Sequence, residues 1–449
     1  MKFGKKAALT LMLAAFAACS MVGCNNGGSS SSANEKYPEY EDAKSMWIGG
    51  WDVPINTKAD YQMAKDMGLT HMFIDNMFAK KGTEAYVEQL KFCEEVGLKA
   101  IVGMDTALDN TAGVQLDETD YSIYPAVDMI NVWDEPYMVN FEELGERIDR
   151  LNEIYNGEMQ LYVNQSPYNP ISATQLTDAT TFLNAVWEHQ LSKINGRKIF
   201  STDIYPLLKV LGGYEVDTGW LSKMETYANF TKKYKSQGAE FHMFIQTYSE
   251  SNRRDVLSKA DLTFQIYTDM AFGINGFTYF TYRKSFLGGF GGGCVENDVS
   301  CKPTDTYYWA QEVNSEISKF DHVYLSFDWD GVMGVNGTNN TESDPEYVNS
   351  SFNLLATPLE QLDCATKVTA TEDTLIGQFK DKDGRDGLIV TNFNEPTADL
   401  SDTVDFEFKD ANRAVVYKNG ERKIYEVKNN KLRLKLATGE GVFVIPVKV

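Results

Sequence analysis

The chain has 449 residues, and its 64 acidic residues outnumber its 42 basic residues, giving a formal net charge of −22 at pH 7. A chain this acidic repels phosphodiester backbones, so we expect no nucleic-acid partner. The length exceeds one small domain and suits a large barrel followed by an accessory domain. Aromatic residues make up 12% of the chain, enough to serve both a core and a surface that stacks on ring-shaped ligands.

Residues 1–24 have the features of an export signal. A lysine-rich start precedes an apolar run over residues 7–18, which is too short to span a bilayer. The small residues before Cys24 resemble the lipobox of bacterial lipoproteins, which implies that Cys24 is lipidated. Residues 25–40 are rich in Asn, Gly and Ser at their start and are expected to form a flexible tether. We therefore expect an exported protein, lipid-anchored to the cell membrane and facing outward; the alternative is an ordinary signal peptide cut elsewhere.

Cysteine and histidine positions bear on disulfides and metals. Cys294 and Cys301 share one glycine-rich loop, and outside the cytoplasm a disulfide is predicted between them. The alternative is a pair of thiols. The four histidines are scattered and show no zinc-ligand spacing, so neither a metal nor another cofactor is expected.

Strand-like and helix-like segments alternate from about residue 45 to residue 320. Thr83 is expected to cap one helix and Gly97 to end it. The predicted strands cover residues 46–51, 71–75, 99–104, 129–134, 159–164, 198–204, 241–247 and 276–282. The predicted helices cover residues 59–67, 83–96, 141–155, 174–191, 221–235, 260–272 and 305–320.

This alternation predicts a (β/α)8 TIM barrel over residues 41–322. An open doubly wound sheet is the alternative, but it requires a phosphate-binding fingerprint after the first strand, and Gly49-Gly50 lacks the rest of that motif. From residue 323 to 449, short Val-, Ile- and Leu-rich strands alternate with turns such as Asn419-Gly420. We expect a small antiparallel β-sandwich domain there.

In such a barrel, working residues stand at the carboxyl ends of the strands. Acids and amides at one mouth can hydrogen-bond sugar hydroxyls, and aromatic rings can pack on sugar faces. The predicted substrate contacts are Trp51, Asp52, Asp75, Asp105, Trp133, Asp134, Asn164, Tyr205, Gln246, Tyr248, Tyr282 and Arg283. Several of these acids also suit helix caps, so the structural interpretation stays open beside the functional one.

The segment Trp133-Asp134-Glu135-Pro136 at the end of the fourth strand resembles the Asn-Glu-Pro signature of the large retaining (β/α)8 glycoside hydrolase clan, which includes β-galactosidases and cellulases. The resemblance extends over most of the barrel. The segments 203–206 and 276–282 also look like parts of uncharacterised glycosidase-like barrels that carry Asp-Glu-Pro. The resemblance to the clan implies that Glu135 is the general acid/base. A carboxyl at a crowded strand end beside Asp134 is expected to have a raised pKa, as a proton donor needs.

The sequence departs from that clan in two places. Asp134 replaces the clan's Asn, and Gln246 stands where the strand-seven nucleophile is expected. Glu250 and Asp203 are the candidates for the second carboxylate. Their distance from Glu135 would decide between retention, at about 5–5.5 Å, and inversion, at about 6.5–9.5 Å.

Two interpretations of function stay open beside each other. The first is a surface-anchored glycoside hydrolase that cleaves an oligo- or polysaccharide. The second is a glycan-binding lipoprotein that has lost hydrolysis, which Gln246 favours. A metal-dependent hydrolase using Asp52, Asp75 and Asp105 is disfavoured, because such barrels normally place histidines on these strands.

Overall fold

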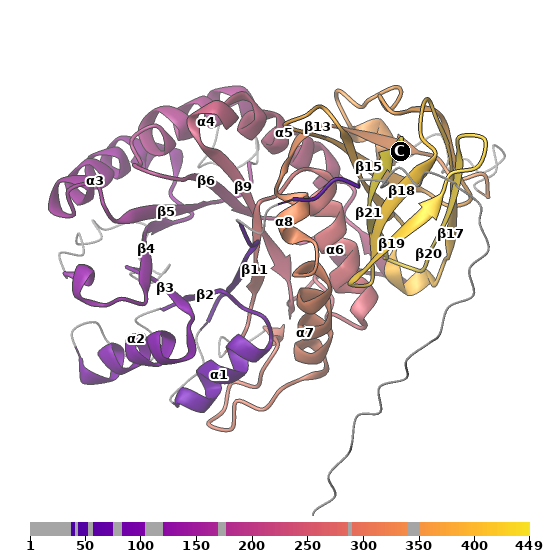
Figure 1. Ribbon diagram of the computed structural model, residues 1–449. Coiled ribbons are helices and arrows are strands. Elements are labelled where there is room, and N and C mark those ends of the chain that lie inside the picture. The colour runs from indigo at the N-terminus through magenta and orange to yellow at the C-terminus, as the bar shows by residue number, and fades with distance from the viewer. Residues whose placement is uncertain are drawn as a thin grey trace, which may run out of the picture. The chain divides into compact units, whose positions relative to one another are not determined.

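Eight parallel strands close into a barrel in the order β1-β11-β9-β6-β5-β4-β3-β2 (Figure 1). The computed structural model describes residues 37–40, 44–52, 57–74, 83–103, 120–168, 177–285, 290–339 and 351–449. The barrel strands are β1 (Trp47–Gly50), β2 (His71–Phe73), β3 (Lys99–Val102), β4 (Val127–Asp134), β5 (Gln160–Gln165), β6 (Lys198–Asp203), β9 (Ala239–Gln246) and β11 (Gly276–Phe280). The closed ring confirms the predicted TIM barrel, and the open-sheet alternative is excluded.

Helices surround this ring. They are α1 (Lys58–Asp66), α2 (Glu84–Val96), α3 (Phe141–Ile154), α4 (Ala179–Val186), α5 (Gly219–Lys233), α6 (Lys259–Ala271) and α7 (Asp305–Ile317). Among the barrel strands, within the described residues, only β3 is not followed by an α-helix. The connection from β3 to β4 contains the short helical turn Tyr121–Ile123, and residues 104–119 lie outside the described ranges.

The predicted caps of α2 are confirmed. The Thr83 hydroxyl accepts a hydrogen bond from the Tyr86 amide, and Gly97 ends the helix with a φ of 74°. Glycine adopts this left-handed conformation without steric cost, so the chain can reverse into β3. Local sequence signals thus set where the barrel's helices begin and end.

The barrel interior is filled by side chains. Its cluster consists of Trp47, Trp51, Phe73, Ile101, Met129, Tyr162, Ile199 and Phe244, contributed by different strands. Layers of inward side chains of this kind make the ring a packed core and leave only its mouth available to a ligand.

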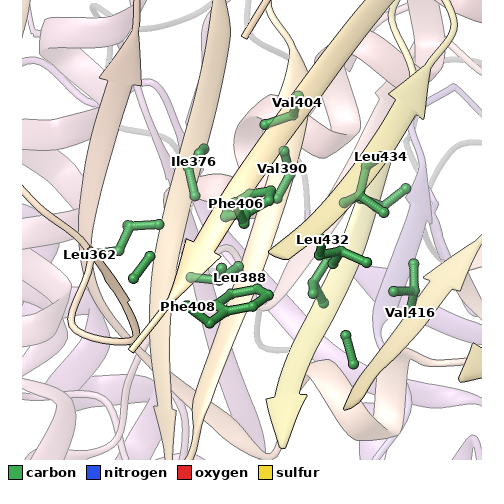
Figure 2. Close-up of a cluster of buried hydrophobic side chains, with 14 of the residues drawn as sticks. Leu362, Ile376, Leu388, Val390, Val404, Phe406, Phe408, Val416, Leu432 and Leu434 are labelled. Carbon is green, nitrogen blue, oxygen red and sulfur yellow. The ribbon is translucent and has the colours of Figure 1, made fainter. Parts of the chain in front are cut away.

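Two antiparallel sheets follow the barrel. One has the order β13-β15-β16-β21-β18-β19 and the other β14-β17-β20. Their bounds are β13 (Phe327–Val335), β14 (Ala365–Ala370), β15 (Thr374–Asp381), β16 (Asp386–Asn392), β17 (Asp402–Phe408), β18 (Arg413–Lys418), β19 (Glu421–Glu426), β20 (Lys431–Leu436) and β21 (Gly441–Val447). Figure 2 shows the apolar cluster between them, with Ile376 and Leu388 from one sheet and Phe406 and Leu434 from the other.

The larger sheet packs on the barrel through α6, which contacts β15, β16 and β21. A side chain at Gly377 would overlap the Ala271 backbone, and one at Gly441 would overlap the Tyr267 ring. These glycines therefore permit the close approach of helix and sheet. The boundary predicted between residues 322 and 323 falls inside α8 (Asp321–Tyr324) and stays a prediction. Within the described ranges, we find no helix with the length and apolarity needed to cross a bilayer.

Candidate active site

A β-bulge in β4 decides which side chains enter the barrel mouth. Asn131 pairs with Tyr162, but Trp133 pairs with Val163 and Asp134 with Asn164, so one extra residue is inserted in β4. The insertion reverses the inward and outward alternation beyond it. Asp134 therefore turns inward beside Asn164. Trp133 turns outward, where the Arg147 guanidinium of α3 lies 4.4 Å from its ring centroid.

Glu135 follows the bulge in a left-handed backbone conformation. Its φ is 49°, and its amide donates a 2.9 Å hydrogen bond to the Asn164 carbonyl. Its carboxyl lies within hydrogen-bonding reach of the Asp203 carboxyl and the Ser166 side chain. A non-glycine residue rarely occupies this conformation, and strained positions of this kind gather at functional sites.

Asn164 connects the acids of two strands. Its Nδ2 donates to Asp134 Oδ1 at 3.2 Å and to Asp203 Oδ1 at 3.5 Å. The three carboxyl groups of Asp134, Glu135 and Asp203, together with the Asn164 amide, are called the acid cluster below. Glu135 and Asp203 thus lie close together, as the predicted carboxylate pair requires.

Burial raises the pKa of each carboxyl in the acid cluster, and repulsion by neighbouring carboxyls adds to it at Asp134 and Asp203. Burial, with the Glu135 charge, raises the pKa of Asp134 to about 7. Burial also raises the pKa of Glu135, and burial with the charges of Glu135 and Asp134 holds that of Asp203 well above its usual value. Adjacent carboxyls do not readily ionise together, so the Glu135–Asp203 pair favours a state with one shared proton.

Aromatic rings form a wall beside the acid cluster. The Tyr205 ring lies 4.8 Å from that of Tyr248 and 5.5 Å from that of Phe280. Tyr248 also stacks on Phe290, and Phe280 contacts Trp51 at the floor of the mouth. The Asp203 charge contributes to the raised pKa of both tyrosines, which places them next to the acids. Their predicted contact with sugar stays a prediction.

A cavity of about 260 Å³ adjoins this wall. The Tyr248 hydroxyl donates to Glu250 Oε1 at 3.2 Å, and Glu250 lines the cavity. Its other charged and aromatic lining residues are Lys209, Tyr214, Arg253, Arg254 and Asp255. Glu250 contacts Tyr248 and Arg253, whereas Asp203 is the carboxyl beside Glu135.

Three further predicted contacts lie fully buried beside the mouth, each with 0% exposure: Gln246, Tyr282 and Arg283. The Gln246 Nε2 donates to the Leu207 and Arg254 carbonyls, so this amide fastens two loops. The pKa of Tyr282 is raised by burial and by Cys294 and Tyr307, which places its hydroxyl away from the acid cluster. Burial removes these three side chains from the surface that a ligand meets.

The predicted disulfide is not formed: Cys294 and Cys301 are buried thiols. The Cys294 thiol hydrogen-bonds Thr247, while Cys301 Sγ donates to the Asp298 carbonyl at 3.7 Å, so the two sulfurs have different partners. Asp52 is half-buried with a φ of 66°. Asp75, Asp105 and Cys24 lie outside the described residues.

Sequence reasoning missed Ser166, Phe280 and Phe290. Phe280 lies inside the predicted strand 276–282. The structure ends this strand at Phe280, and strand alternation then places the Phe280 side chain at the mouth. No sequence signal marked the other two. Across the described ranges, no group of three or more His, Cys, Asp or Glu side chains is arranged to hold a metal ion.

Comparison with known proteins supports the fold. No protein-family model matches the chain, and no curated protein matches it. Among solved structures, a catalytic mutant of a GH42 β-galactosidase from G. stearothermophilus is 10% identical, with a TM-score of 0.51 over 91% of this chain and 99% of that chain. A candidate α-galactosidase from Bacteroides fragilis is 11% identical, with a TM-score of 0.51 over 90% of this chain and 80% of that chain.

A β-galactosidase from the psychrophilic Marinomonas ef1 matches less closely, with 12% identity and a TM-score of 0.40. The match covers 63% of this chain and 62% of that chain. At such identities the likeness is one of fold: this chain has a barrel of the kind that glycoside hydrolases use.

Proposed function

We propose that this protein is a glycoside hydrolase in which Glu135 and Asp203 are the catalytic pair. The observation that carries the proposal is the close approach of their carboxyls at the mouth of the barrel. Carboxyls with raised pKa that face each other without a cation are costly, and such groups mark catalytic sites. The main influences on the pKa of the three acids are burial, the neighbouring carboxyls and hydrogen bonds rather than a cation.

A two-carboxylate mechanism starts with one proton on the pair, and this proposal assigns that proton to Glu135 when a substrate is bound. Glu135, in its protonated form, donates to the glycosidic oxygen as the bond from that oxygen to C1 breaks, while ionised Asp203 bonds to C1. Glu135 then takes a proton from water, whose oxygen displaces Asp203 from C1. This mechanism retains the anomeric configuration. Carboxyls in hydrogen-bonding contact lie closer than the about 5–5.5 Å of retaining pairs, so the mechanism requires Glu135 and Asp203 to separate when a substrate binds.

The surroundings of the acid cluster favour an oligo- or polysaccharide as substrate. The Tyr205 ring lies beside Asp203 and packs on the buried Tyr248 ring. Beyond Tyr248, the 260 Å³ cavity contains both donors and acceptors and the partly exposed Tyr214 ring.

The test compares Glu135→Gln and Asp203→Asn with the wild type on a panel of aryl glycosides and oligosaccharides. Each amide removes one carboxyl with little change of shape, so turnover is expected to fall about 10³-fold or more. Asp128→Asn makes the same change at the opposite end of β4 and is expected to retain turnover. Glu135→Gln should lose least on glycosides whose leaving group needs no protonation.

Two outcomes would contradict this proposal. If the wild type binds an oligosaccharide but releases no product from any glycan, the glycan-binding alternative holds. If it neither binds nor cleaves glycans, the carbohydrate assignment is wrong. Mutarotation interconverts the two product anomers and would hide the stereochemical outcome. The first product is therefore followed by NMR before mutarotation occurs.

We also propose that Cys24 is lipidated and anchors the protein to the outer face of the cell membrane. The basic start, the apolar run of residues 7–18 and the small residues before Cys24 support this proposal. In detergent phase separation of the full-length protein expressed in bacteria, the wild type should enter the detergent phase. Cys24→Ala should remain in the aqueous phase, and equal partitioning of both would refute the anchor.

A further inference from the structure

The Asn164 amide in the acid cluster has chemically different ends, and each end meets a different partner. Its Nδ2 faces the Asp134 and Asp203 carboxyls. Its Oδ1 accepts a 3.0 Å hydrogen bond from Ser201 Oγ. Asn164 and Ser201 are register partners on the neighbouring strands β5 and β6, and both side chains are buried. The orientation of this amide is therefore fixed by its partners rather than by solvent.

A second buried hydroxyl fixes the direction of the Ser201 bond. Tyr162 OH donates to Ser201 Oγ at 2.5 Å, from within the barrel core. A serine hydroxyl has one hydrogen. Because Ser201 accepts the hydrogen of Tyr162, its own hydrogen is directed at Asn164 Oδ1. Rotating the amide by 180° would break this bond and would set a carbonyl oxygen against two carboxyls.

We propose that Tyr162 and Ser201 are positioning residues that hold the Asn164 NH2 group toward Asp134 and Asp203 and thereby help to set which acids of the cluster keep a proton. Tyr162 bonds to Ser201 and Ser201 bonds to Asn164, so both hydroxyls act on the acids through Asn164. The catalytic meaning of this inference rests on the proposed hydrolase function, but the hydrogen-bonded chain is a property of the folded protein alone.

The expected direction of the effect follows from the charges. An N–H donor stabilises an ionised carboxylate, and the Asn164 hydrogen bond lowers the pKa of both Asp134 and Asp203 against the burial and repulsion that raise them. Without the Ser201 hydroxyl, the amide is no longer held in one orientation. The pKa of both carboxyls should then rise.

The test is a ¹³C NMR titration of the aspartate carboxyl carbons, which needs no substrate. Asp134 and Asp203 are assigned by Asp134→Asn and Asp203→Asn. In Ser201→Ala, both carboxyls are expected to titrate about 0.5–1 pH unit higher than in the wild type. Tyr162→Phe keeps the ring and should give a smaller shift in the same direction.

The matched control is Thr202→Val on the same strand. Thr202 is fully buried, and its hydroxyl makes no hydrogen bond within the described residues, so its removal should leave the titration unchanged. If Ser201→Ala titrates like the wild type, or if Thr202→Val shifts the acids equally, the inference is overturned. Should Ser201→Ala fail to fold, the Tyr162→Phe titration decides alone.

Activity assays separate this inference from the proposed function. If the wild type cleaves no glycan while Ser201→Ala still shifts the carboxyl titration, the positioning role stands and the hydrolase proposal fails. If the wild type is active, kcat/KM is measured against pH. The acid limb of this profile should lie at higher pH in Ser201→Ala than in the wild type, by the same amount as the NMR shift. If the wild type is active but the carboxyls of Ser201→Ala titrate as in the wild type, the hydrolase proposal stands and the positioning role is rejected.

Discussion

The two ends of the barrel hold their carboxyl groups in opposite electrostatic settings. At the amino end of the strands, His71 Nε2 lies 3.4 Å from Asp128, and its hydrogen bond lowers the pKa of that carboxyl. Burial alone would raise the pKa of Glu240, but His242 and Arg197 lower it, and the Arg197 guanidinium lies 2.6 Å from Glu240. Each acid at this end has a partner that favours its charged form.

At the carboxyl end, Asp134, Glu135 and Asp203 face one another and one neutral amide, and the pKa of each is raised. β4 itself connects the two settings, since it runs from one residue before Asp128 to Asp134. Partial burial is common to both ends, so burial does not explain the difference; the partners do. Acids whose partners favour the charged form stabilise the barrel. Buried acids that face other acids destabilise it when they ionise, and such groups are typical of functional sites.

Neutralising Asp134 is expected to give the largest effect in this comparison. Its folded pKa of about 7 exceeds the ordinary value of 3.8, so the folded state holds a proton that the unfolded chain has lost. Wild-type stability therefore falls as the pH rises from about 4 to about 7. Asp134→Asn removes that loss and should be about 1–3 kcal/mol more stable than the wild type at pH 8.

Urea unfolding at pH 4 and pH 8 measures this difference. At pH 4 both proteins carry a neutral group at position 134, and their free energies of unfolding should nearly coincide. Stabilisation of the same size at both pH values would mean that packing, rather than charge, distinguishes the variant. If Asp134→Asn is less stable than the wild type at pH 8, burial and the Glu135 charge do not destabilise ionised Asp134, and the comparison between the two ends is wrong.

The sequence predicted the barrel well because its signals are local and repeated. Thr83 caps the beginning of α2 and Gly97 caps its end, as predicted, and the eight predicted strands correspond to the eight strands of the barrel. The strand limits were less accurate: the predicted strand 276–282 ends at Phe280. Hydrogen bonding between neighbours, which the sequence does not show, decides where pairing stops.

For the site, position along a strand was predictable but the direction of a side chain was not. Glu135, Asp203 and Asn164 were expected at strand ends, and the structure brings them together. Trp133 was expected beside them, but the bulge turns it to α3. Gln246 was expected as a substrate contact, but its amide completes backbone hydrogen bonds of two loops. Both outcomes depend on contacts between segments distant in sequence.

Asp128→Asn is expected to give the smallest effect, with the opposite sign to Asp134→Asn. Because the folded pKa of Asp128 is lowered, its ionised form stabilises the fold above about pH 4, and that contribution is lost as the pH falls through the folded pKa. The Asp128 side chain is 33% exposed, so solvent screens the pair and the loss should stay below about 1 kcal/mol at pH 7. Urea unfolding should show this loss at pH 7 and a progressively smaller loss as the pH falls below about 4. A gain in stability at pH 7 would remove the distinction between the two ends, because it would mean that Asp128 too is an acid without effective compensation.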